Sequence, residues 1–200
     1  VTITANPTTI AAAGGTSTLT YSAVRDVLTN GVVTSTEKAT PTVSGSATGF
    51  TRSGATVTAA NNTSASSRSV TYTATHGGKS ATCTVRQSAG SVSYTYTFTF
   101  SDGSTSTSWS SIAAGGDSKS YSIVSTRVVK WNGVQTGTEN VSYSGSSNVS
   151  WASVSGSKIT VGDNPNASAR SGVVTFTQAS SGKTIKVTLL QLKKNSVDIN

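Results

Sequence analysis

The same pattern of residues occurs twice in this chain. "NNTSASSRSVTYTATHGGKSATCTVRQ" spans residues 61–87, and "NPNASARSGVVTFTQASSGKTIKVTLLQ" spans residues 164–191. Each copy runs from an Asn-rich segment through an Arg and an alternating run to a Gly-Lys turn, a second alternating run and a closing Gln. The landmarks "IAAAGG" and "IAAGG", which end at Gly15 and Gly116, recur at a similar spacing. A repeat of about 100 residues exceeds a solenoid unit and indicates a duplicated domain.

The alternating runs predict β-strands. In the first copy Val70 and Tyr72 alternate with Thr, and in the second copy Ile185, Val187 and Leu189 alternate with polar residues. A period of two is typical of a strand with one solvent-facing and one core-facing side, and Gly in the linking turn allows the positive φ of a hairpin. No stretch has the 3.6-residue period of a helix. We therefore expect antiparallel β-sandwiches.

The end of the second copy carries the motifs of a known family. "WASVSGSKITV" begins at Trp151, and an Asn-rich turn, Arg170 and a final strand ending at Gln191 follow it. This stretch resembles the BACON type of bacterial immunoglobulin-like module. The first copy is similar in "GGKSATCTV", but it has Phe50 near the position of Trp151 and no Gly after its Arg. The resemblance implies tandem immunoglobulin-like domains of the kind found in Bacteroidetes surface proteins and phage virion proteins.

The predicted fold class is therefore all-β, with two tandem antiparallel immunoglobulin-like β-sandwiches. We expect the first sandwich over residues 1–90, the second, BACON-like sandwich over 91–192, and a C-terminal tail over 193–200. A chain of 200 residues has room for two domains of this size.

The charge pattern argues against a nucleic-acid partner. The formal net charge is +8, from 15 Lys and Arg against 7 Asp and Glu, but the basic residues are spread singly along the chain. Binding to nucleic acid requires basic residues that gather on one face, usually with stacking aromatics between them. No apolar stretch reaches the length of a transmembrane helix, so we expect no membrane insertion either.

The reactive residues predict no catalytic site, metal site or cofactor. Cys83 and His76 are the only Cys and His, and the alternation in "SATCTVRQ" places Cys83 on the core-facing side of a strand while His76 lies in a turn. A nucleophile needs an oriented base, and a zinc site needs three or four ligands. We therefore expect no enzyme, and a Cys83 that is buried, reduced and inert.

Two arginines and two aromatic residues have structural roles in this interpretation. Arg68 and Arg170 occupy the same position in the two copies, where we expect them to brace the Asn-rich loop or to bond a nearby backbone carbonyl. Trp151 stands where the first copy has Phe50, and we expect it in the core.

Four residues of the second copy are candidate ligand-binding residues: Trp131, Lys130, Tyr121 and Trp109. The first three face Thr29 or gaps in the first copy, so the fold does not require them. Trp109 lies in "SDGSTSTSWSS", which also lacks a clear counterpart. An exposed Trp beside Lys can stack on a sugar ring or dock on a protein partner. Core packing is the alternative role for Trp131.

These observations predict a non-catalytic, surface-displayed immunoglobulin-like protein for adhesion or decoration. The expected location is extracellular, on a phage virion head or tail or on a bacterial cell surface. The expected partners are other virion or cell-surface proteins, with polysaccharide or glycan contact as a further expectation. The alternative is a purely structural spacer or capsid-cementing protein without a ligand.

Overall fold

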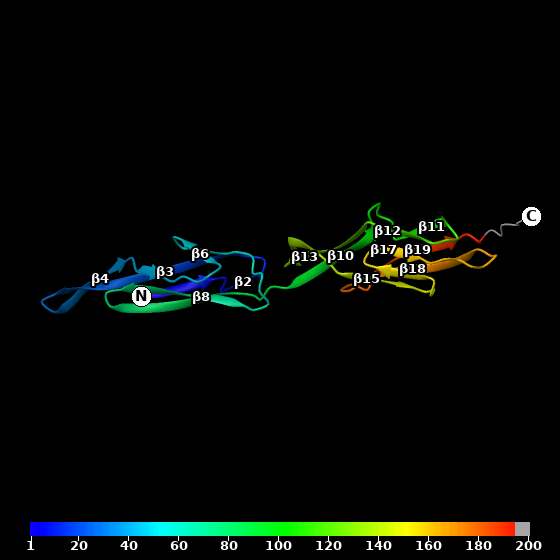
Figure 1. The fold of residues 1–200 in the computed structure, drawn as a ribbon. Helices are drawn as coiled ribbons and strands as arrows, with labels where there is room; N and C mark the ends of the chain where they lie inside the picture. The colour runs from blue at the N-terminus through cyan, green and yellow to red at the C-terminus, as the bar shows by residue number, and fades with distance from the viewer. Residues whose placement is uncertain (195–200) are drawn as a thin grey trace, which may run out of the picture. The chain divides into compact units, whose positions relative to one another are not determined.

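The computed structural model describes residues 1–194, and all of their regular structure is β-strand (Figure 1). The strands of the first repeat are β1 (Thr2–Asn6), β2 (Thr9–Ile10), β3 (Gly15–Thr29), β4 (Val32–Ala39), β5 (Thr42–Ser44), β6 (Phe50–Ser53), β7 (Thr56–Ala59), β8 (Arg68–His76) and β9 (Lys79–Gln87). Those of the second repeat are β10 (Val92–Phe100), β11 (Ser106–Ile112), β12 (Asp117–Ser120), β13 (Ile123–Trp131), β14 (Val134–Asn140), β15 (Tyr143–Ser147), β16 (Ala152–Ser155), β17 (Lys158–Val161), β18 (Arg170–Gln178) and β19 (Thr184–Gln191). The expected tail 193–200 lies outside the described residues from residue 195 onward.

The chain forms two compact units. The first comprises Val1–Ser93 together with Val129–Thr136, and the second comprises Tyr94–Val128 together with the residues from Gly137 onward. Each repeat has a hydrophobic core of its own. The domain limits expected from the repeat stay a prediction.

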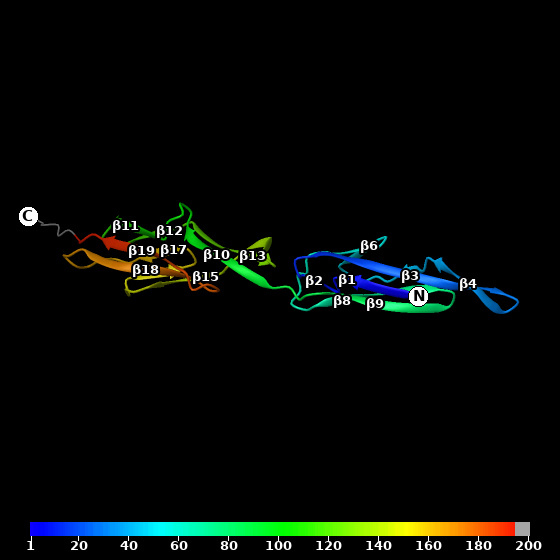
Figure 2. The same cartoon turned by 180° about the vertical axis from the view of Figure 1, so that it is seen from behind.

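The strand order of the first repeat is that of an immunoglobulin-like sandwich. One sheet has the order β1-β3-β7-β6, with β4 paired to β3, and the other has the order β2-β9-β8-β5. The pairs are antiparallel, as for β8 and β9 in Figure 2, except that β2 runs parallel to β9. Strands β1, β3, β7 and β6 thus take the places of A, B, E and D, and β5, β8 and β9 those of C, F and G.

The second repeat has the same arrangement. Its sheet β11-β19-β18-β15 corresponds to β2-β9-β8-β5, including the parallel pair β11 and β19. The sheets β12-β17-β16 and β10-β13-β14 supply the counterpart of the other layer. The predicted all-β fold of two tandem sandwiches is confirmed.

The alternating residues of the facing sheets form the two cores. In the first repeat, Leu19 of β3 and Val57 of β7 pack with Tyr72 of β8 and Val85 of β9, and all four are at most 2% exposed. In the second repeat the core is richer in aromatic rings. Its fully or almost fully buried members include Phe98, Phe100, Ile159, Phe176 and Ile185.

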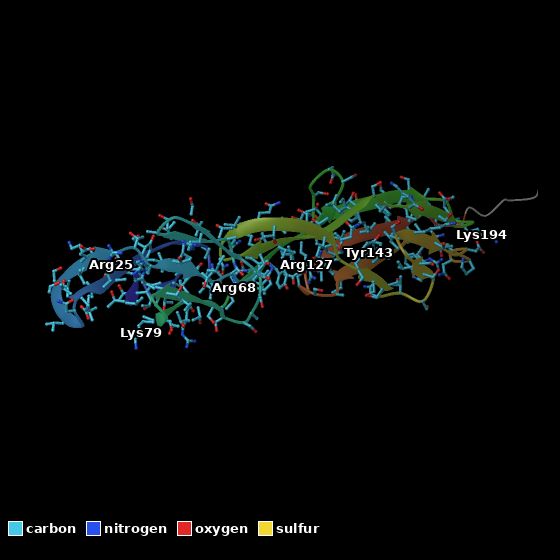
Figure 3. The ribbon with its side chains drawn as sticks, turned by 90° about the vertical axis from the view of Figure 1, so that its left-hand side faces the viewer. Arg25, Arg68, Lys79, Arg127, Tyr143 and Lys194 are labelled. Carbon is cyan, nitrogen blue, oxygen red and sulfur yellow. The ribbon has the colours of Figure 1, made fainter. Side chains whose placement is uncertain are left out.

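A buried glutamine at the end of β9 ties three segments of the first repeat together. Gln87 is fully buried, and its Nε2 donates to the carbonyl oxygens of Ala11, Ala12 and Ala60 at 3.1, 3.2 and 2.8 Å. Arg68 (Figure 3) completes the cluster, because its Nε donates to Gln87 Oε1 and its Nη2 to the Ala60 carbonyl, each at 2.7 Å. The side chain therefore adds a second donor to these carbonyls, which also accept from the N–H groups of Gly14 and Asn62 and from Arg68.

The second repeat contains the same cluster. Gln191 is fully buried, and its Nε2 donates to the carbonyl oxygens of Ala113, Ala114 and Gly162 at 2.9, 3.2 and 2.8 Å. Arg170 donates from Nε to Gln191 Oε1 at 2.8 Å and from Nη2 to the Gly162 carbonyl at 3.1 Å. The expectation that the two arginines hold the neighbouring loop through its carbonyls is confirmed.

A buried asparagine shapes each Asn-rich loop. Asn62 is 1% exposed and Asn164 is fully buried, and the Nδ2 of each donates to two carbonyl oxygens. The acceptors are Ser66 and Ser88 in the first repeat and Ser168 and Leu192 in the second. Each loop is thereby held to the residue that follows the closing glutamine.

The two arginines also lie over aromatic rings. The guanidinium carbon of Arg170 is 4.4 Å from the ring centroid of Trp151, and that of Arg68 is 5.7 Å from the ring centroid of Phe50. Phe50 is buried, whereas Trp151 is half-buried and packs against the core from its side. These cation–π contacts orient each guanidinium toward its glutamine.

Cys83 differs from the expectation of full burial. Its side chain is half-buried and packs at the margin of the first core, because the alternation determines which face it occupies but not how completely the opposite sheet covers it. Burial nevertheless raises the pKa of the Cys83 thiol above its ordinary value of 9.0.

We expect replacement of Gln191 by Ala to destabilise the second repeat by about 2–4 kcal/mol, because three carbonyls each lose one of their two donors and the Arg170 Nε loses its buried acceptor. Urea unfolding followed by circular dichroism and Trp fluorescence measures the change. The exposed Gln135→Ala serves as the control and should stay within about 0.5 kcal/mol of the parent. Equal effects of the two substitutions would contradict the role of Gln191.

We expect Cys83 to react slowly with a thiol reagent at pH 7 in native buffer. Its raised pKa leaves less thiolate at neutral pH than an ordinary cysteine has, and thiolate is the reacting species. The labelling rate should therefore be well below that of the protein unfolded in guanidinium at the same pH, and it should rise as the pH passes 9.0. Equal rates in the folded and unfolded protein would refute the prediction.

Candidate functional site

Trp109 is a core residue and not an exposed one, contrary to the expectation from sequence. It lies on β11, is 9% exposed and belongs to the second core. It is aligned with the fully buried Leu189 on β19, so both side chains point to the same face. The register shifts between Trp109 and Ile112, where Ser111 has a φ of 61°. This irregularity interrupts the alternation of buried and exposed residues, so the sequence pattern does not reveal that Trp109 faces the core.

Tyr121 packs against the second core with its ring. The centroid of its ring is 5.6 Å from that of the buried Phe100, and Lys119 Nζ is 5.3 Å from the Tyr121 ring. The hydroxyl oxygen of Tyr121 is buried and has no hydrogen-bond partner among the described residues. Burial raises the pKa of Tyr121 from 10.0 to about 12.

A hollow of about 200 Å³ lies beside Tyr121 in the second unit. Its polar wall consists of Ser101, Asp102, Thr107, Lys119, Ser120 and Ser122. Asp102 accepts hydrogen bonds from the backbone N–H of Ser104 at 2.9 Å and from its hydroxyl at 2.7 Å. These two bonds lower the pKa of Asp102, so the hollow presents its carboxylate at neutral pH, and the Lys119 side chain lines the same wall. A small polyhydroxylated ligand would find both donors and acceptors here.

Lys130 and Trp131 lie at the end of β13, directly before the turn into β14. Both are half-buried. Trp131 lies beside Gly90, because a Cβ atom added to Gly90 would come within 3.1 Å of Trp131 Cε3. Neighbouring atoms, Gly90 among them, therefore cover part of the Trp131 side chain, and the rest of it is exposed to solvent.

The four predicted residues do not form one cluster within either unit. Trp109 and Tyr121 belong to the second compact unit, and Lys130 and Trp131 belong to the first. Whether they bind a ligand stays a prediction, and the burial of Trp109 leaves Trp131, Lys130 and Tyr121 as the accessible candidates.

The sequence reasoning gave no role to an exposed aromatic residue on β10. Tyr94 is 43% exposed, and the guanidinium carbon of Arg127 is 4.6 Å from its ring centroid. Arg127 Nε donates to Glu139 Oε2 at 2.7 Å, which holds the guanidinium in place. The alternation in "SYTYTFTF" signals this face, which runs from exposed Tyr94 to buried Phe98 and Phe100.

The reactive residues remain apart in the part of the chain that the structure describes. Within residues 1–194, no three His, Cys, Asp or Glu residues lie close enough to hold a metal ion. The same residues contain no helix of the length and hydropathy needed to span a membrane. Cys83 faces the first core, and His76 ends β8.

No protein-family model and no curated protein matches this chain. Among solved structures, it is similar to a protein from Bacteroides vulgatus ATCC 8482, with 31% identity and a TM-score of 0.41 over 53% of this chain and 95% of that one. It is also similar to the extracellular cadherin domains 1–4 of protocadherin gamma B7, with 10% identity and a TM-score of 0.38 over 94% of this chain and 49% of that one. The titin domains z1z2 in complex with telethonin align with 12% identity and a TM-score of 0.33 over 94% of this chain and 92% of that one.

We expect Tyr121→Phe to leave the stability at pH 7 unchanged or to raise it by up to about 1 kcal/mol, because it removes a buried hydroxyl that lacks a partner. Burial raises the pKa of Tyr121 in the folded protein from 10.0 to about 12, so the unfolded chain loses this proton at lower pH than the folded protein does. The free energy of unfolding therefore falls as the pH rises from 10.0 to about 12. The variant should therefore lose less stability than the parent between pH 7 and pH 11.

Urea midpoints at the two pH values test this prediction. The control is Tyr94→Phe, at a ring that is 43% exposed, and this variant should follow the parent. A Tyr121→Phe variant that is markedly less stable at pH 7 would show that the hydroxyl has a partner.

The three similar solved structures have TM-scores below 0.5, so the fold class rests on the strand order of this chain itself. The chain is an all-β protein of tandem immunoglobulin-like β-sandwiches.

Proposed function

We propose that this chain is a non-catalytic, surface-displayed immunoglobulin-like protein that serves in adhesion or decoration. One observation carries the proposal. The glutamine clusters and the hydrogen bonds of the Asn-rich loops are duplicated, whereas the hairpin end at Lys130 and Trp131 has Leu28 and Thr29 in the other repeat. Side chains that a fold does not require, placed at the end of a sandwich, are free to serve binding.

The chemistry of these residues suits a glycan or a protein partner. An indole that keeps part of its face in solvent can stack on a sugar ring, and an adjacent ammonium group can donate to its hydroxyls. The hollow beside Tyr121, with its hydroxyls, carboxylate and ammonium group, offers a second place for a sugar unit. The partners in this proposal are other virion or cell-surface proteins, with polysaccharide as a further ligand.

The motif from Trp151 to Gln191 supports the assignment to the BACON type of immunoglobulin-like module. The proposed location is accordingly extracellular, on a phage virion or on a bacterial cell surface. This finer assignment rests on the turn and core residues of the motif, which specify a fold rather than a ligand.

A structural spacer or capsid-cementing role is the second candidate. The half-burial of Trp131 against Gly90 favours it, because a packed indole has less surface to offer a ligand. The two candidates differ in what removal of the Trp131 ring does.

We expect Trp131→Ala to weaken binding of the chain to its glycan or protein partner. Its cost in stability should stay well below the range of about 3–5 kcal/mol for a truncated core aromatic such as Trp109, because Trp131 is only half-buried. Binding to an array of bacterial and host glycans, measured beside urea unfolding, tests both parts.

Thr29→Ala is the matched control for this experiment, because Thr29 holds the corresponding position of the first repeat. This variant should change neither binding nor stability. If Trp131→Ala costs as much stability as Trp109→Ala and the parent binds no glycan, the spacer role is the better description.

A further inference from the structure

The two repeats carry the same long β-hairpin. The first hairpin consists of β3 and β4, and the second consists of β13 and β14. Asn30 and Asn132 begin the two turns, and each has a φ of 53°. The glycines that follow them have φ values of 80° and 83°. Two successive positive φ values define the turn that matches the twist of a hairpin, so the two tips have the same backbone form.

An ion pair occupies the same place on both hairpins. Arg25 Nε donates to Glu37 Oε2 at 2.9 Å on the first hairpin, and Arg127 Nε donates to Glu139 Oε2 at 2.7 Å on the second. Arg25 and Arg127 are both labelled in Figure 3. The hairpins therefore agree in turn and in side-chain pairing, and differences between their tips come from the few residues that vary.

The tip of the second hairpin is bound to an Asn-rich loop. Asn132 Nδ2 donates to Asn61 Oδ1 at 2.7 Å and to the Asn62 carbonyl at 3.0 Å, and its Oδ1 accepts from the Ser91 N–H at 2.9 Å. All of these residues belong to the first compact unit. Lys130, Trp131 and Asn132 are accordingly half-buried, whereas Val134, on the other strand, stays 54% exposed.

The tip of the first hairpin is exposed. Leu28, in the place of Lys130, is 57% exposed, and Asn30, in the place of Asn132, is exposed as well. Val33, which pairs with Leu28 across the hairpin and so shares its face, is 53% exposed. This tip is more apolar than its bound counterpart, and large exposed apolar side chains that lie together mark interaction surfaces.

The second repeat has a loop that matches the one bound by Asn132. Asn164 Oδ1 accepts from the Asn166 N–H at 3.2 Å, as Asn62 Oδ1 accepts from the Ser64 N–H at 3.2 Å. The Lys194 N–H donates to the Asn166 carbonyl, as the Gly90 N–H donates to that of Ser64. The two loops therefore have the same hydrogen-bonded form.

The acceptors that Asn132 uses also recur in this loop. Asp163 takes the place of Asn61 and is exposed, so its carboxylate can accept from an amide as the Asn61 oxygen does. The carbonyl of Asn164 corresponds to that of Asn62. The residue that would correspond to Ser91 lies outside the described residues.

We propose that copies of this chain associate head to tail, with the first hairpin of one copy bound to the Asp163–Asn166 loop of a second copy. The chain carries an exposed hairpin and an exposed loop whose counterparts already bind each other within the first compact unit, which is why the partner is a second copy. Asn30 takes the role of Asn132, and Leu28 contributes apolar contact. The two surfaces differ, so the contact is heterologous and can extend from copy to copy.

Sedimentation equilibrium of the whole chain tests the proposal. The average mass should rise above 20.2 kDa as the protein concentration approaches about 1 mM, since contacts of this small size are weak. Leu28→Asp should weaken the association at least about tenfold, and Asn30→Gly, which keeps the positive φ, should weaken it by a smaller factor.

Val32→Asp is the matched control, because it adds the same charge to the same hairpin at a position whose counterpart, Val134, stays exposed. It should associate as the parent does. A parent that stays at 20.2 kDa throughout, or equal losses for Leu28→Asp and Val32→Asp, would overturn the proposal.

A mixing experiment separates this arrangement from a symmetric contact between two hairpins. Leu28→Asp impairs the hairpin and leaves the loop intact, and Asp163→Lys does the reverse. Each variant alone should associate weakly, whereas an equimolar mixture should form pairs of one copy of each and stop there. If Asp163→Lys associates as strongly as the parent, the loop is not the binding surface and the proposal fails.

Discussion

Each sandwich depends on one buried amide. The side chains of Gln87 and Gln191 each reach three backbone carbonyls from two separate segments, and each is held by an arginine that also bonds the neighbouring loop. Because each amide bonds carbonyls of two segments that are far apart in the sequence, it fixes both segments against the end of the final strand. The early turn, the loop before β8 or β18, and the final strand thereby become one structure.

Because this cluster is present in both repeats, the differences between the repeats fall elsewhere. They are found at the hairpin tips, where Leu28 stands against Lys130, and at the Asn-rich loops, where Asn61 stands against Asp163. The same backbone thus presents two different surfaces. The proposed adhesive role and the proposed association of copies both use these variable positions and leave the duplicated cluster to maintain the fold.

The repeat and its alternation were enough to predict the fold class, the strands of the final hairpins and the role of Arg68 and Arg170. They gave the wrong environment for Trp109, which is buried. The irregularity at Ser111 shifts the register of the strand, so its buried residues do not alternate with polar ones in the sequence. They overstated the burial of Cys83, because alternation predicts which face of a strand a residue occupies but not how much of that face the opposite sheet buries. The unpartnered hydroxyl of Tyr121 has no signal in the sequence at all.

The sequence alone determined that this chain is a duplicated β-protein, because period, turn residues and repeat spacing are local properties of the chain. It also marked the glutamine, arginine and asparagine of each copy as a recurring set. Only the tertiary structure decided which atoms these side chains bond, which aromatic rings are covered, and that Asn132 binds an Asn-rich loop while Asn30 stays exposed. Those outcomes depend on contacts between residues far apart in the chain, and such contacts exist only once the sheets have packed.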